Sequence, residues 1–301
     1  NLGEAVDVAE AMICDETFVV LTLSGAMTMA GMNPLIIEMI ERGWVHCIVA
    51  TGALVGHGLV EDLGMPHYKH KVGVSDEDYY KLRLNRVYDV LEPEANLDAL
   101  ELRMREFLRE LAEERIEPLA THELLRLLGE KLGGRGVLQA AAAKDVPVII
   151  PAFTDSELGL DFAVHQDLQR GRGLPFLRYD AFADLNDFCR LCQKAQREDK
   201  KLGIFTIGGG VPRNWAQQVG PYVDVRNHRL GLSEPRIRYT YALRICPDPA
   251  HYGHLSGCTY SEGVSWGKFV PAAEGGRFAE VLLDATVGWP LITRALIERG
   301  L

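Results

Sequence analysis

A lysine near the C-terminus has neighbours that could make its amine a nucleophile. It ends the run Ser265-Trp266-Gly267-Lys268, which follows Glu262. The indole of Trp266 offers an apolar face, and a lysine partly removed from water loses some preference for its charged form, as a nucleophilic amine must. The same ring could bind a cationic ligand, and Glu262 could hold that ligand or accept a proton. We predict Lys268 and Glu262 as catalytic residues, with Trp266 and Glu262 also binding substrate.

The pattern of apolar residues predicts the scaffold that must position this lysine. Apolar, β-branched runs alternate with helical periodicities, which is typical of a parallel sheet covered by helices on both faces. We expect an α/β fold with a doubly wound, mostly parallel sheet, formed by residues 1–301 as one domain. Strands are expected at 17–24, 46–51, 146–151, 202–208, 241–245 and 278–283, with helices at 33–43 and 289–299. Amphipathic helices at 94–117 and 121–131 predict a helical insertion over about 93–144, packed on one face.

Small residues or carboxylates follow five of these strands, and ligands bind at the carboxyl ends of strands in such sheets. Glycines let the backbone approach a pyrophosphate, helix N-termini favour its charge, and carboxylates can bind ribose hydroxyls. Each of these glycines and carboxylates, taken alone, could simply form a turn or cap a helix. The Gly-x-Gly-x-x-Gly fingerprint of dinucleotide-binding proteins is absent. Together they predict a dinucleotide cradle. Its members are Ser24, Gly25, Ala26, Met27, Thr28, Met29, Thr51, Gly52, Ala53, Asp155, Gly209, Asp284 and Ala285.

These motifs, in their order along the chain, resemble the deoxyhypusine synthase family. The Ser-Trp-Gly-Lys run after a glutamate looks like the family's active-site lysine motif, and further matches fall at 24–31, 51–53, 154–156, 208–210, 255–257 and 284–285. The resemblance implies a Rossmann-like fold and a homotetramer with active sites between subunits. It also implies that NAD takes hydride from spermidine, that an aminobutyl group moves through an imine on Lys268 to an acceptor amine, and that the hydride is then returned. It implies a substrate-binding loop formed by Gly253, His254, Leu255 and Ser256.

The sequence departs from the family at residues expected to recognise the polyamine. Asn214 stands where the best-known members carry a histidine, and an amide can hydrogen-bond but cannot exchange a proton near neutral pH. The family's paired acids fall on a glycine and His57, which is either the missing titratable group or a cap of the following helix. Two further acidic positions fall on Leu255 and Leu160, with Asp161 beside the latter. We therefore add His57 and Asn214 to the catalytic set and Asp161 to the substrate-binding set.

Three interpretations of the function follow. The acceptor is either a protein lysine, as in deoxyhypusine synthase, or a free diamine such as putrescine, as in homospermidine synthase activity. The alternative is a non-catalytic NAD-binding paralogue acting as a regulatory subunit. Asn214 favours that alternative and the intact lysine motif argues against it. A conventional dehydrogenase ranks last, because an obvious Arg/His pair for binding a hydride donor is missing.

The amino-acid composition excludes some classes of protein. The 301 residues carry 32 basic and 42 acidic side chains, a net charge of −10. This balance argues against nucleic-acid binding and suits a cationic substrate. No apolar run approaches ~20 residues and no signal peptide is visible, so we expect a cytoplasmic protein without membrane contact. The six cysteines include one close pair, Cys189 and Cys192, so no zinc site is predicted; His67 and His70 are expected in a surface loop.

Overall fold

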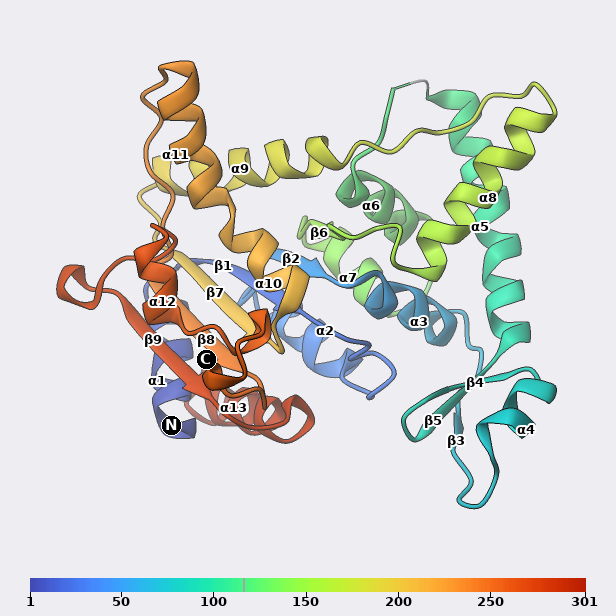
Figure 1. The fold of residues 1–301 in the computed structure, drawn as a ribbon, viewed down its shortest axis with the longest axis horizontal. Coiled ribbons are helices and arrows are strands. Elements are labelled where there is room, and N and C mark those ends of the chain that lie inside the picture. The colour runs from blue at the N-terminus through green and yellow to red at the C-terminus, as the bar shows by residue number, and fades with distance from the viewer. Residues whose placement is uncertain (116) are drawn as a thin grey trace.

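The computed structural model describes residues 1–115 and 117–301, and its centre is a six-stranded sheet (Figure 1). All neighbouring strands run parallel, in the order β6-β2-β1-β7-β8-β9. Their bounds are β1 (Phe18–Leu23), β2 (Cys47–Ala50), β6 (Val148–Ile149), β7 (Leu202–Ile207), β8 (Tyr241–Ile245) and β9 (Arg277–Val281). Counted within this sheet the order is 3-2-1-4-5-6, the Rossmann arrangement. The α/β prediction is confirmed, although the third strand is shorter than expected and the last begins and ends earlier.

Each strand contributes side chains to two hydrophobic cores, one on each face of the sheet. Successive side chains of a strand point to opposite faces. In β1, Val19 and Leu21 accordingly pack with α1 (Leu2–Cys14), α2 (Asn33–Glu41) and α13 (Ala285–Glu298), whereas Val20 packs on the other face. The second core is closed by α9 (Ala181–Arg197), α10 (Gly210–Gln217), α11 (Val219–Leu230) and α12 (Tyr260–Ser265). Helix α1 was not predicted, and α13 begins four residues before the expected helix.

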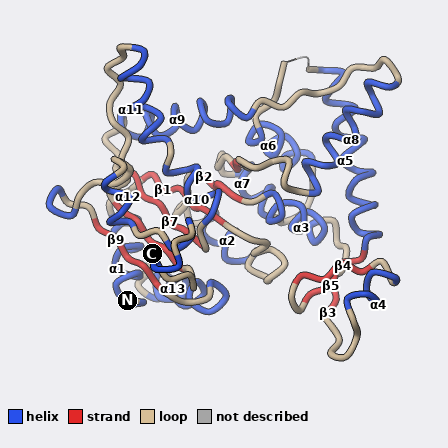
Figure 2. The backbone as a smooth tube through the Cα atoms, in the orientation of Figure 1, coloured by secondary structure: helices blue, strands red, loops and turns tan. Residues whose placement is uncertain are grey.

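The chain between β2 and β6 contains the predicted helices together with a sheet that was not predicted. Its helices are α3 (Gly52–Asp62), α4 (Asp76–Lys81), α5 (Glu94–Glu114), α6 (Thr121–Lys131) and α7 (Val137–Ala143). The strands β3 (Tyr68–Lys69), β4 (Leu84–Val87) and β5 (Val90–Pro93) form an antiparallel sheet in the order β3-β5-β4, well away from the large one (Figure 2). Helix α5 ends three residues before the expected boundary, and residue 116 of that prediction lies outside the described residues. Helix α6 matches the expected range.

The remaining elements complete the edges of the molecule. Helix α8 (Glu157–Gly171) packs against α3 and α5, far from α12 in Figure 1. Short 3-10 helices occur at Ala250–Tyr252, Leu255–Gly257 and Ala272–Glu274. None of the helices in the described part of the chain has the length and apolarity to cross a membrane. Within the same residues, no group of three or more His, Cys, Asp or Glu side chains could hold a metal ion.

Candidate active site

The predicted cofactor residues meet where β1 and β7 lie side by side and the chain leaves them in opposite directions. This point of a doubly wound sheet forms a crevice at the carboxyl ends of the strands. The backbone N–H of Gly209 donates to Ser24 Oγ at 3.2 Å, and the Ser24 hydroxyl donates to the Gly209 carbonyl. A Cβ on Gly209 would lie 2.5 Å from the Cα of Ser256, so only glycine allows this approach. The loops after β1, β7 and β8 therefore converge.

The turn after β1 also joins the turn after β2. Thr51 donates from its hydroxyl to the Gly25 carbonyl at 2.5 Å, and Thr28 donates to the Leu54 carbonyl at 2.8 Å. Thr28 and Met29 are buried, so their side chains hold this turn from inside. The turn after β6 comes equally close, because a Cβ on Gly52 would lie 2.2 Å from Ser156 Cβ. The structure thus brings together turns that lie as far apart in the sequence as Ser24 and Gly209.

The residues of this crevice fit a dinucleotide. Helices α3, α10 and α13 begin here, and their first backbone N–H groups favour a pyrophosphate. No atom lies within 4 Å of the place where a Cβ on Gly210 would stand, so the first turn of α10 faces open space. Asp155 is exposed, and Asp284 caps α13 by accepting from the Thr286 N–H at 2.9 Å, with Ala285 as the first residue of that helix. Both carboxylates are available to hydroxyl groups.

Lys268 is positioned by the way α12 ends. Gly267 adopts a left-handed conformation with φ of 71°. The Gly267 N–H donates to the Val264 carbonyl at 3.0 Å, and the Lys268 N–H donates to the Gly263 carbonyl at 3.2 Å. These two bonds form a Schellman motif, which strongly favours glycine at the left-handed position. The glycine of the lysine motif therefore ends the helix and turns the next side chain inward.

The Lys268 side chain lies in a pocket of about 210 Å³ between α10 and α12. It is only 9% exposed, and Nζ donates to Asn214 Oδ1 at 3.0 Å. Burial lowers the pKa of the amine below its usual range; the Arg213 guanidinium lowers it as well, while Cys258 and Glu262 act in the opposite direction. A lysine with a lowered pKa is neutral for a larger fraction of the time, which favours nucleophilic attack.

Trp266 lines this pocket, but it is more exposed than the sequence suggested. The indole is 65% exposed, and Lys268 Nζ lies 6.0 Å from its ring centroid, at the outer limit for a cation–π contact. The indole is therefore one of several groups that bury the amine, with Arg213 and Asn214 of α10 among the others. Glu262 lines the same pocket and is exposed, with its backbone N–H donating to Thr259 at the start of α12. Both residues stand where they can contact an entering ligand.

The predicted substrate loop lies at one side of this pocket. Leu255 lines it. Gly253 turns the chain with φ of 74°, and Ser256 is held by Asp248 at 2.5 Å and by His254 Nδ1 at 2.8 Å. These contacts fix the loop next to Gly209. Four predicted substrate residues and the predicted cofactor crevice are thus adjacent.

His57 lies in a separate group, which we call the Glu92 cluster: Glu61, His57, His67 and Glu92. Glu92 is fully buried and forms ion pairs with His57 and, at 3.2 Å, with His67 Nε2. His67 Nδ1 lies 3.2 Å from Glu61. His57 is in the middle of α3, so it is not a helix cap. His67 is in a loop, as predicted, but its side chain is largely buried between Glu61, six residues earlier, and Glu92, 25 residues later. The cluster does not line the Lys268 pocket, and α3 is well separated from α12 in Figure 1.

Asp161 is also remote from Lys268 within one chain. It lies on α8, which packs against α5. Burial raises the pKa of this carboxyl to about 6, and the charges of Glu101 and Glu157 raise it as well. The side chain does not line the Lys268 pocket. Its substrate-binding role therefore remains a prediction that a single chain cannot fulfil.

Four side chains that line the Lys268 pocket were missed from the sequence: Arg213, Gln217, Gln218 and Cys258. Arg213 and Gln217 stand four residues apart on α10 and line the pocket together with Cys258. A helix that begins at the triple glycine puts positions 213, 214 and 217 on neighbouring faces. Once Asn214 was selected, this helical spacing was the signal that could have identified Arg213 and Gln217 as site residues.

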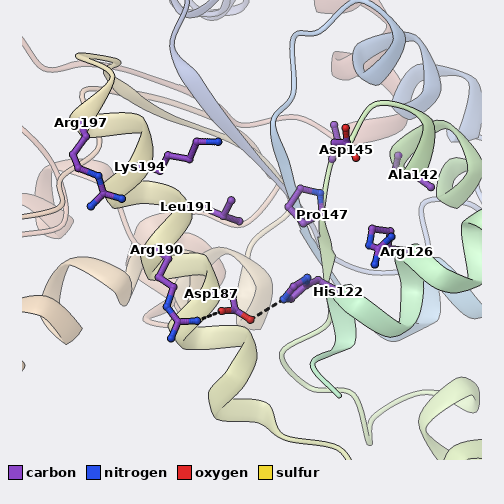
Figure 3. Close-up of a pocket in the computed structure, with 12 residues that line it drawn as sticks. His122, Arg126, Ala142, Asp145, Pro147, Asp187, Arg190, Leu191, Lys194 and Arg197 are labelled. Atoms are coloured by element: carbon purple, nitrogen blue, oxygen red, sulfur yellow. Dashed lines mark hydrogen bonds and ion pairs between the residues drawn. The ribbon is translucent and has the colours of Figure 1, made fainter. Parts of the chain in front are cut away.

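A second pocket, of about 420 Å³, lies between α6, α7 and α9 (Figure 3). Val146 and Pro147 precede β6, so this pocket is at the amino ends of the strands, opposite the Lys268 edge. His122 lies 3.1 Å from Asp187, which also pairs with Arg190. The lining has more basic side chains than acidic ones, four (Arg126, Arg190, Lys194 and Arg197) against two (Asp145 and Asp187), and it contains none of the predicted site residues.

Comparisons with known proteins agree with this geometry. The family model described as deoxyhypusine synthase matches residues 1–296. The chain belongs to the deoxyhypusine synthase family. It is 32% identical to "Probable deoxyhypusine synthase 2" of Methanosarcina acetivorans, over 99% of this chain and 82% of that protein. It is 33% identical to the "Deoxyhypusine synthase-like protein" of Chlorobaculum parvum, over 97% of this chain and 80% of that protein.

The fold is shared with solved structures of the family. A crystal structure of an Entamoeba histolytica protein assigned as a deoxyhypusine synthase superposes with a TM-score of 0.64, covering 99% of this chain and 87% of that one. The identity is 16%, so this likeness supports the fold alone. The family is one of transferases that use NAD, which agrees with the crevice beside Lys268.

Proposed function

We propose that this protein transfers an aminobutyl group from spermidine, or a close relative, through an imine on Lys268 to an acceptor amine. The observation that carries the proposal is the buried Lys268 amine, hydrogen-bonded to Asn214 and adjacent to the glycine-rich crevice. A surface lysine would remain protonated and hydrated, whereas this one is prepared for attack.

NAD would bind in the crevice, with the backbone at Ser24–Met29, Thr51–Ala53 and Gly209 around its phosphates and with Asp155 and Asp284 at its hydroxyl groups. When bound, it supplies a hydride acceptor that makes the carbon–nitrogen bond of the polyamine breakable and later returns the hydride. The protein therefore needs a nucleophile that stores the fragment between the two halves of the reaction, and Lys268 occupies that place.

The residues around the Lys268 amine have different roles in the transfer. Neutral Lys268 attacks the oxidised carbon, the carbon–nitrogen bond to the departing diamine breaks, and the fragment stays on Nζ as an imine. Asn214 Oδ1 accepts a hydrogen bond from Nζ and so aims the amine without taking its proton. The exposed carboxylate of Glu262 binds a substrate ammonium group at the entrance of the pocket, and Trp266 covers the aliphatic chain.

We further propose that a second copy of the chain completes the site. His57 and Asp161 are the predicted residues that one chain does not bring to Lys268, and both lie on the α3–α8 side of the molecule. A homo-oligomer, expected as a tetramer, would place that side of one copy against the Lys268 pocket of another. His57, held by Glu92, would then supply the proton exchange that Asn214 cannot.

The test is to trap the fragment. The protein is incubated with NAD and spermidine and reduced with borohydride, and the peptides are analysed by mass. We expect the mass of one aminobutyl group on the peptide containing Lys268 and on no other. Lys194→Met, a change of an exposed lysine, is the matched control and should trap normally. Failure to trap with several polyamines, although NAD binds, would support the non-catalytic NAD-binding alternative.

A further inference from the structure

A buried guanidinium without a carboxylate stands beside Lys268. Arg213 is 2% exposed and lines the Lys268 pocket. Its Cζ lies 4.9 Å from the ring centroid of Tyr260, and Nη1 donates to the Leu255 carbonyl at 3.4 Å. Nε and Nη2 are buried and have no acceptor among the described residues. A buried charge left in this state is costly, so the site is incomplete as it stands.

A second buried arginine, whose Nε also has no acceptor among the described residues, shows how this protein neutralises such a charge. Arg244 is 5% exposed, and its Nη1 donates to the Ser256 and Cys258 carbonyls at 2.6 and 2.9 Å. Its Nη2 pairs with the Glu280 carboxylate on the neighbouring strand. Arg213 is buried to the same degree and has no ion pair with a described residue. The group missing from the Lys268 pocket is therefore a carboxylate.

A neighbouring amide and the charges of the pocket also indicate that a carboxylate ligand is missing. Gln217 is 4% exposed, and its Nε2 has no acceptor among the residues described. It lies four residues after Arg213, on the same face of α10. Arg213 and Lys268 are the basic side chains that line the pocket, and Glu262 is its acidic one. A ligand carrying only ammonium groups would bring positive charge next to an unneutralised guanidinium, whereas a carboxylate would fill both sets of donors.

We propose that the acceptor is a small amino acid with a side-chain amine, whose carboxylate binds Arg213 and Gln217 while its amine reaches Lys268. This deepens the proposed function and rests on it. The acceptor amine adds to the imine carbon, the bond from that carbon to Lys268 Nζ breaks, and Nζ takes the proton that the acceptor nitrogen loses. The returned hydride then reduces the new imine. Spermidine and the amino acid thereby become propane-1,3-diamine and an N-aminobutyl amino acid, with no net oxidation.

The test compares two probes that differ only in a carboxylate: L-ornithine and putrescine. Binding of each to the full-length protein with NAD is measured by calorimetry. We expect ornithine to bind about 10-fold tighter or better, the effect of one charge-assisted hydrogen-bond pair. Arg213→Met should abolish that preference, by weakening the binding of ornithine and by not weakening that of putrescine. Arg197→Met, which removes an arginine that lines the other pocket, should change neither value. If Arg213→Met does not fold, Gln217→Met and Arg213→Lys can replace it. Each should reduce the preference for ornithine by a smaller amount.

A second measurement follows the fragment. The Lys268 adduct, formed before borohydride is added, should be discharged by ornithine faster than by putrescine or by a lysine-containing peptide. Equal or better binding and discharge with putrescine or the peptide would overturn this inference while leaving the trapped adduct, and with it the proposed function, intact. Conversely, preferential ornithine binding that depends on Arg213, without any adduct on Lys268, would overturn the proposed function and retain the carboxylate site.

Discussion

The Lys268 pocket and the Glu92 cluster are both built from buried ionisable groups, but their charges are arranged in opposite ways. In the pocket, a lysine and an arginine face amide side chains, and the amine of Lys268 donates to the uncharged Asn214. In the cluster, one fully buried carboxylate is flanked by two imidazoles. Burial without an opposite charge favours the neutral form of a group, whereas burial with a partner preserves the charge.

This difference suggests that the Lys268 pocket supplies the nucleophile and the Glu92 cluster supplies the proton exchange. The pocket keeps an amine ready to attack and offers it no group that titrates near neutral pH. The Glu92 cluster holds titratable imidazoles but no nucleophile. The two lie on different parts of the fold, the first on α10 and α12 over the parallel sheet and the second between α3 and the small antiparallel sheet. Each lacks what the other has, which is why we place them in one site across two copies of the chain.

The largest effect is expected from Lys268→Met. Transfer should fall by at least about 10³-fold, because no other amine lines the pocket within the described residues. Stability should change in the opposite direction. Burial lowers the pKa of Lys268, so at neutral pH the unfolded chain holds this proton more tightly and folding is penalised. The variant should therefore have a higher Tm at pH 7, and its advantage should shrink towards about pH 10, where the unfolded lysine also loses its proton.

Residual transfer in Lys268→Met near the wild-type rate would show that the pocket is not the reacting centre. A variant that loses transfer and also unfolds more easily at pH 7 would contradict the account of the buried amine. Thermal unfolding at several pH values, measured beside the trapping reaction, separates these outcomes.

The next effect concerns Asn214, the acceptor for the Lys268 amine. Asn214→Ala removes the hydrogen bond that aims Nζ and should slow formation of the Lys268 adduct about 10-fold to 100-fold. Asn214→His introduces into the pocket the kind of group that the Glu92 cluster already contains. We expect it to add an ionisation near pH 6.5 to the pH–rate profile. An unchanged profile in Asn214→His would mean that proton exchange at this position does not limit the reaction.

A smaller effect is expected from Glu92→Gln, which tests whether the cluster takes part. Glu92 is a positioning residue in our account, acting through His57. Its loss removes the carboxylate that orients the His57 ring, so the rate should fall by about 10-fold. His57→Gln should lower the rate similarly and make it less dependent on pH. If both variants lower only the Tm and leave the profile unchanged, the cluster is structural.

The sequence was sufficient to predict the parallel sheet and the residues along its carboxyl edge. The buried strands β7 and β8, of six and five residues, give mostly apolar runs, and the turn after β7 carries glycines that the backbone requires. The small sheet could not be predicted in the same way. Its strands have two to four residues, and β3 is fully exposed, so no apolar period marks them.

Partners that are distant in sequence explain the other differences. His67 was assigned to a surface loop because no acidic partner was evident nearby, yet Glu61 lies six residues before it and Glu92, 25 residues away, packs onto it. Trp266 was expected to bury Lys268 because the two are close in the motif. It does line the pocket, but another wall comes from α10, some 50 residues earlier. Arg213 was overlooked because only tertiary packing shows that a charged side chain next to the triple glycine is buried.

The smallest effect sharpens the interpretation of Glu92. Asp62 ends α3, the helix that carries His57, and packs closely against Gly136 without an imidazole partner. Burial raises the pKa of this carboxyl to about 6, and the charge of Glu61 raises it as well. Asp62→Asn should therefore stabilise the protein by about 1 kcal/mol at pH 7.

The sign of this gain distinguishes Asp62 from the Glu92 cluster. The unfolded carboxyl loses its proton near pH 4 and the folded one only near pH 6, so stability falls as the pH rises through this window. The gain from Asp62→Asn should thus be complete above about pH 6 and absent below about pH 4, with transfer unaffected. Asp98→Asn, at an exposed site, should show no such window. If Glu92→Gln matches Asp62→Asn in both Tm and pH–rate profile, burial alone accounts for Glu92, and the proposed pairing of the two regions fails.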